Sequence, residues 1–135
     1  MSKLLIRGAA ILLLLYVGLV TAFEAWLGYT QPTSEGTIVI TTFQDGVGTD
    51  RVVTRILTDG QLYVAANHWP RAWYRATLAE PDVRVSMDGV TADYLAVPVQ
   101  GAEHDRVEAS RPLSLFFRFL TGFPPRYFVR LDAKA

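Results

Sequence analysis

The residues best suited to chemistry gather in one short segment, from Asn67 to Arg75. It holds aromatic rings able to stack on a ring system, polar groups able to hydrogen-bond, and arginines able to hold an anion. A flavin-like redox site needs no more, because its cofactor carries the hydride and the protein supplies stacking, hydrogen bonds and charge. Two further arginines lie four residues apart, hence on one side of a predicted strand. The candidate cofactor-binding residues are Arg51, Arg55, Asn67, His68, Trp69, Trp73 and Tyr74.

Each of these candidates also has a purely structural interpretation. Trp73 fits the core anchor of a helix, and Tyr74 fits a core or a site equally well. The arginines fit solvated side chains or surface ion pairs, which stabilise little. His68 could be a proton donor or an axial metal ligand, whereas His104 sits in a charged helix far along the chain. No residue is assigned as catalytic, and no metal site is predicted.

Composition excludes several classes of protein. The 135 residues allow one domain, and 13 Lys plus Arg balance 13 Asp plus Glu, so no nucleic-acid partner is expected. The chain has no cysteine, which excludes a disulfide framework, a thiolate metal site and a cysteine nucleophile.

Hydrophobic residues make up 50% of the chain, and the excess begins with the 16 uncharged residues from Gly8 to Phe23. Basic residues precede this run and an aromatic belt follows it, so Gly8 to Leu27 is predicted to cross a membrane and contact lipid. A cleaved signal peptide is the competing interpretation, and a buried core helix is the weakest, because about a hundred residues could not surround it. Lys3 and Arg7 precede the span, which places the soluble domain on the extracytoplasmic side.

The predicted organisation is an anchor over 1–28, a linker over 29–36 and a domain over 37–135. Aspartate-glycine pairs at 59–60 and 88–89 signal hairpins, and the stretch 44–50 must also turn. Helices are expected over 72–80, 103–109 and 113–120. Strands are expected over 37–43, 51–58, 62–66, 83–87, 91–99 and 127–131. The fold class is therefore mainly β with helices (α+β), a six-stranded β-barrel preceded by one transmembrane helix.

The phenylalanine-rich segment from Pro112 to Pro125 is too short to span a bilayer. We expect it to fill one end of the barrel as a core helix. Two other roles also fit this segment: a face that lies on the membrane beside the anchor, or a channel for a quinone.

The residues from Thr37 to Gly89 carry a resemblance to a known family. The segment resembles the deazaflavin-dependent nitroreductase and quinone reductase family. The matching features are Ala66-Asn67, Trp73-Tyr74, Leu78-Ala79, Pro81 and the strand leading to Gly89. The resemblance implies a split, flavin-reductase-like β-barrel that binds a deazaflavin coenzyme or FMN and reduces a lipophilic quinone or a nitro compound. A homodimer is a further expectation.

Two function classes stay open at this point. The first is a membrane-anchored oxidoreductase of the kind the resemblance implies, and the segment from Asn67 to Tyr74 favours it. The second is a non-catalytic barrel that binds a lipophilic ligand, haem or a membrane partner. The acidic stretch from Gln44 to Asp50 favours the second, because it is a poor cradle for a phosphate.

Overall fold

The computed structural model describes residues 2–31, 36–67 and 71–134. A long helix, α1 (Lys3–Thr30), precedes β1 (Thr37–Gln44), β2 (Val47–Thr58), β3 (Gln61–Ala66) and α2 (Ala72–Ala79). The chain continues with β4 (Asp82–Met87), β5 (Val90–Pro98), α3 (Gly101–Ser110), α4 (Leu115–Leu120) and β6 (Tyr127–Ala133). The candidates His68 and Trp69 lie outside the described residues.

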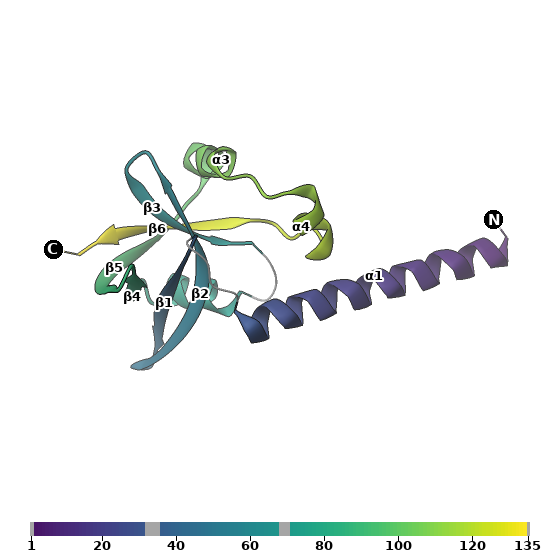
Figure 1. The fold of residues 1–135 in the computed structure, drawn as a ribbon, viewed down its shortest axis with the longest axis horizontal. Coiled ribbons are helices and arrows are strands. Elements are labelled where there is room, and N and C mark those ends of the chain that lie inside the picture. The colour runs from purple at the N-terminus through teal and green to yellow at the C-terminus, as the bar shows by residue number, and fades with distance from the viewer. Residues whose placement is uncertain (1, 32–35, 68–70, 135) are drawn as a thin grey trace.

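The six strands form a closed antiparallel barrel in the order β1-β2-β3-β6-β5-β4. Closure leaves no strand with an unpaired edge, which is how a small all-antiparallel sheet avoids pairing with other chains. This confirms the predicted six-stranded barrel. Figure 1 shows α1 projecting away from the barrel as a single rod, with the C-terminus on the opposite side of the barrel.

Alternating burial along the strands builds the core. On β1, Ile38, Ile40 and Thr42 face inward while their neighbours are only partly buried. The side chains of Ile38 and Ile40 join an apolar cluster inside the barrel. Its fully buried members are Ile38, Ile40, Val53, Leu62, Val64, Val83, Val85, Ala96, Val129 and Leu131.

A second cluster lies between the barrel and α3. Val107 of α3 is fully buried against Phe128 of β6 and Tyr63 of β3. The Tyr63 hydroxyl donates to a Glu103 carboxylate oxygen at 2.8 Å, and Arg130 donates to both oxygens of the same carboxylate at 3.0 and 3.2 Å. Burial, followed by the bond to Glu103, raises the pKa of Tyr63. These bonds fix α3 against β3 and β6.

Aspartate-glycine pairs make three of the hairpins. The pairs at 59–60 and 88–89 have positive φ at both residues, as two-residue turns of this type require, so both predicted hairpins are confirmed. Asp45-Gly46 makes a third turn of this kind. The prediction of a turn over all of 44–50 was therefore wrong: Val47 to Asp50 already pair with β1.

The phenylalanine-rich helix does not fill the barrel, and that prediction was also wrong. None of the residues of α4 is buried, and the helix packs on α1 instead. The barrel interior is already filled by the alternating strand residues, so the apolar side chains of α4 find no place in it.

The helix α1 is long and apolar enough to cross a membrane. Its most apolar stretch has a mean hydropathy of 2.2 and is 0% buried by the rest of the chain. A signal sequence would pass the same test of length and composition.

Candidate cofactor pocket

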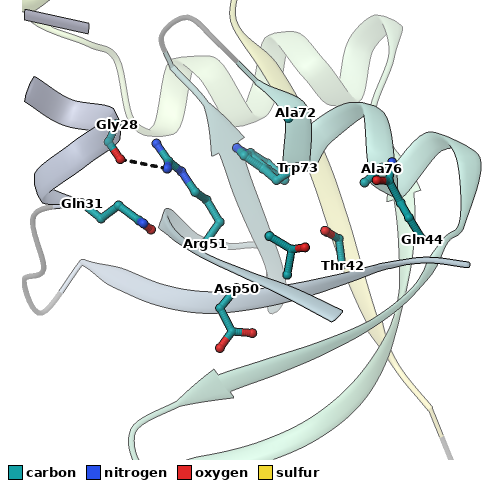
Figure 2. Close-up of a pocket in the computed structure, with 10 residues that line it drawn as sticks. Gly28, Gln31, Thr42, Gln44, Asp50, Arg51, Ala72, Trp73 and Ala76 are labelled. Carbon is teal, nitrogen blue, oxygen red and sulfur yellow. Dashed lines mark hydrogen bonds between the residues drawn. The ribbon is translucent and has the colours of Figure 1, made fainter. Parts of the chain in front are cut away.

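The main candidate site is a hollow of about 510 Å³ where β1, β2 and α2 meet the C-terminal end of α1. That volume falls within the usual range for small-molecule pockets, about 300 to 1,000 Å³. Figure 2 shows residues of all four elements around it. The lining residues are Gly28, Gln31, Thr42, Gln44, Thr49, Asp50, Arg51, Ala72, Trp73 and Ala76.

Arg51 holds the site together. Its Nη1 donates to the Gly28 carbonyl oxygen at 3.1 Å, at the end of α1 where helix carbonyls carry partial negative charge. The neighbouring Val52 amide donates to Gln31 Oε1 at 3.0 Å, which fastens the same helix end to β2. The end of the long helix is thereby part of the pocket wall.

Trp73 supplies the aromatic wall. It lies in the first turn of α2, is partly buried and packs against the barrel core. Ala72 and Ala76, on the same helix, leave space around the indole because their side chains are small. Figure 2 shows the indole and the Arg51 side chain projecting into the same region, from opposite walls. A flat ring can lie against the indole, and an anionic group of the same molecule can reach the guanidinium.

The acidic residue of the lining does not oppose an anion here. The Asp50 carboxylate accepts a hydrogen bond from the Thr41 hydroxyl at 2.6 Å, and Figure 2 shows it directed away from Arg51. The carboxylate keeps its negative charge but is directed away from the guanidinium (Figure 2). The acidic character of the segment 44–50 thus does not exclude anion binding at Arg51.

Two smaller hollows adjoin the pocket, and Arg51 lines both. One, of about 50 Å³, reaches Asn67 and shares Trp73 with the main pocket. The other, of about 140 Å³, extends to Leu27 of α1 and Phe117 of α4. Arg51 therefore stands between the main pocket and the apolar surface that α1 and α4 share.

The structure thus places Arg51, Trp73 and Asn67 around adjoining hollows, whereas Arg55 and Tyr74 line none of these hollows, although the Tyr74 ring lies edge-on to that of Trp73 with centroids 6.1 Å apart. Arg55 pairs with Asp88 at 3.1 Å instead. Tyr74 stacks on Tyr127, with ring centroids 5.2 Å apart and planes 11° from parallel. Burial, followed by the neighbouring Tyr127, raises the pKa of Tyr74.

Asn67 has a structural partner. Its Oδ1 accepts from Arg126 Nε at 2.7 Å, and both side chains are buried. Arg126 also donates to the Arg111 carbonyl oxygen at 2.5 Å and stacks over Phe128. Burial lowers the pKa of Arg126 to about 10, so it stays charged at neutral pH.

Sequence reasoning missed the polar residues of the lining. Thr42 is buried at an inward position of β1, where a hydroxyl in an apolar alternation marks a candidate site residue. Gln31 and Gly28 carry no such signal, because their place in the wall depends on how α1 docks.

The fold is a small closed antiparallel barrel with a hollow beside it that is lined by an indole and a guanidinium. Residues 15–112 match the model of the F420H(2)-dependent quinone reductase family. The chain belongs to this family, whose members are deazaflavin-using oxidoreductases. No curated protein sequence matches the chain significantly.

Solved structures show the same fold at low identity. One described as a domain-swapped dimer has a TM-score of 0.58 and 16% identity over 74% of this chain and 82% of its own. An F420-H2 dependent reductase, FDR-A, has a TM-score of 0.55 and 16% identity over 72% of this chain and 94% of its own. HutZ, a heme storage protein from Vibrio cholerae, has a TM-score of 0.56 and 14% identity over 86% and 88%.

The Asn67 contact generates a first prediction. Asn67→Ala should lower the free energy of unfolding by about 1 to 3 kcal/mol, because it leaves a buried Arg126 donor without its acceptor. Asn67→Asp keeps an acceptor oxygen and is the matched control. Urea denaturation of the full chain in detergent measures both. Equal losses for the two variants would show that the amide's NH₂ group, and not the bond to Arg126, matters.

Proposed function

We propose that this protein is a membrane-anchored oxidoreductase that uses a deazaflavin coenzyme to reduce a lipophilic quinone. The observation that carries the proposal is the pocket of about 510 Å³ lined by both Trp73 and Arg51, in a chain of this family. FMN, which has a similar ring system, is the second candidate for the same pocket, and a nitro compound is the second candidate acceptor.

The pocket residues suit such a cofactor. Trp73 would cover one face of the ring system, while the Arg51 guanidinium, with five donors, would hold the phosphate. Thr42 and Gln44 on β1 would hydrogen-bond the polar edge of the ring. The reduced deazaflavin, when bound, supplies the hydride. The protein's own part is then to orient the ring and to exclude water, so no side-chain nucleophile is required.

The smaller hollow beside Phe117 supports a lipophilic acceptor. It is lined by Leu27 and Phe117 on one side and by Arg51 on the other. A molecule entering between α1 and α4 would reach the arginine that lines the cofactor pocket without leaving an apolar surface. A homodimer is a further part of the proposal, supported by the similar barrel described as a domain-swapped dimer.

Trp73→Ala should weaken deazaflavin binding about tenfold or more. Aromatic stacking is worth about 1 kcal/mol beyond the area it buries, and the lost area adds to that. Binding is measured by quenching of deazaflavin fluorescence, with circular dichroism to confirm folding. Tyr74→Phe is the matched control, because it keeps a ring that stacks on Tyr127, outside the pocket. Unchanged affinity in folded Trp73→Ala would contradict the site, and binding of haem alone would support a non-catalytic barrel.

Arg51→Met should raise the Kd of the phosphate-bearing deazaflavin about 10- to 100-fold, since a hydrogen bond to a charged group contributes about 1.5 to 3 kcal/mol. The Kd of the dephosphorylated deazaflavin should not change. Arg55→Met is the matched control, because it removes the same charge from the same strand at a residue paired with Asp88. An equal rise for both forms of the cofactor would show that Arg51 only holds α1 in place.

We also propose that α1 is a retained single-pass anchor with the barrel on the extracytoplasmic side. Lys3 and Arg7 precede its apolar run, and Glu24 follows it. A reporter pair fused after Ala135, alkaline phosphatase for the outer side and a fluorescent protein for the inner side, measures the orientation. Activity of the phosphatase fusion is expected. A fluorescent inner-side fusion would reverse the assignment, and a shortened mature chain would show cleavage.

A further inference from the structure

The helix α4 presents an apolar surface that the barrel does not cover. Leu115 is 73% exposed and Phe116 71%, while Phe119 and Phe123 are 43% and 53% exposed. Such a cluster of large apolar side chains on one short segment marks an interaction surface.

This surface is continuous with that of α1. The Phe119 ring lies 4.9 Å from the ring of Tyr16, and the Phe117 ring lies 5.9 Å from that of Phe23. After α4 the backbone comes close to α1 at Gly122, where a Cβ atom would lie only 3.2 Å from Val20 Cγ1. Figure 1 shows α4 on the same side of the barrel as the projecting part of α1.

The ring contacts between α4 and α1 indicate how deep α4 would lie in a membrane that α1 crosses. Tyr16 and Phe23 are seven residues apart, which corresponds to about 10 Å along a helix. Phe23 ends the uncharged run of α1, so it marks the level at which the apolar span meets the interface. From there α4 extends along α1 toward the middle of the span, by the depth typical of helices that lie in one leaflet, about 5 to 10 Å.

Several backbone groups of α4 have hydrogen-bond partners within the protein, as an apolar solvent requires. The Ser114 hydroxyl accepts from the Phe117 amide, and the Phe117 carbonyl accepts from both the amide and the hydroxyl of Thr121. The Phe119 carbonyl accepts from the Tyr16 hydroxyl at 2.7 Å. This last bond also gives a partner to a polar group in the middle of a membrane span, where an unsatisfied hydroxyl would be costly.

The segment from Pro112 to Pro125 carries a single charged residue, Arg118. Arg118 is in the last turn of α4 and lines a hollow of about 530 Å³ with His104, Glu108 and Arg126. Arg118 therefore has polar neighbours in this hollow, as suits a long cationic side chain beside a membrane interface.

We propose that α4 is inserted in the bilayer beside α1, with Leu115, Phe116 and Phe123 contacting lipid acyl chains. The protein would then hold the membrane at two places, a spanning helix and a helix in one leaflet, and the barrel could not swing about the end of α1. The inference rests on the proposed insertion of α1 but not on any cofactor or activity.

The absence of cysteine from the sequence makes the test direct. Single cysteines at Phe116 and Phe123 are spin-labelled in the full chain, which is reconstituted in vesicles of phosphatidylcholine with some phosphatidylglycerol. Collision with oxygen and with a water-soluble nickel chelate then reports depth. Val47 and Val90, apolar residues of hairpins that are 66% and 67% exposed, are matched controls, and Leu12 of α1 is the lipid reference.

The labels at Phe116 and Phe123 should resemble that at Leu12, with the oxygen-to-nickel collision ratio raised at least several-fold above the values at Val47 and Val90. A ratio equal to that of Val90 would overturn the proposal, as would a water-exposed label at Leu12. Strong dipolar broadening at Phe116 without lipid contact would show that a second copy of the chain covers α4, and would overturn it too. Deazaflavin binding, measured separately, leaves these outcomes unaffected.

Discussion

The structure depends on the junction between the end of α1 and strand β2. A helix end exposes carbonyl groups that need donors, and here Arg51 supplies one. Gln31, in the left-handed conformation that ends the helix, returns a side-chain oxygen to the Val52 amide. In both bonds β2 donates and the end of α1 accepts, so two donors of the strand satisfy two acceptors of the helix end. Without them the pocket would lack a wall and α4 would lack a defined place against α1.

The closed barrel provides the rigid support for this junction. Each strand pairs on both sides, and the interior is filled by alternating aliphatic residues. A densely packed core is hard to deform, so β2 can present Arg51 and Val52 at fixed positions. The candidate pocket lies beside the barrel, where α2 and the end of α1 meet β1 and β2.

The sequence predicts local features well when one residue type determines them. The aspartate-glycine pairs at 59–60 and 88–89 require positive φ, and alternation defines the inward face of each strand, so both could be read directly. The segment 44–50 was harder, because its second glycine, Gly48, is a strand residue facing Phe43 and not part of the turn. A glycine shows where the backbone is free and not how that freedom is used.

Partners distant in the chain could not be predicted in the same way. Asn67 is a polar residue next to aromatic ones, which fits a ligand contact, but its acceptor oxygen is taken by Arg126, 59 residues further on. The pocket residues Gly28 and Gln31 belong to a predicted anchor and linker and enter the site only because α1 docks on β2. The apolar run of α4 fitted a core helix equally well, since apolarity alone does not tell protein interior from lipid.

The position of Arg51 connects the two halves of the molecule. A cation beside a membrane is commonly placed to contact headgroups, yet this one is turned inward to a helix end and to three adjoining hollows. One of these hollows opens toward Leu27 and Phe117, on the side where α1 and α4 lie together. An apolar molecule reaching Arg51 by that path would exchange only lipid contacts for protein contacts, so it would avoid the cost of crossing water. A soluble cofactor could reach the main pocket from the other side of the same residue. In the membrane-anchored arrangement proposed above, Arg51 would therefore both hold the end of α1 and lie between an aqueous and a lipid approach to one site.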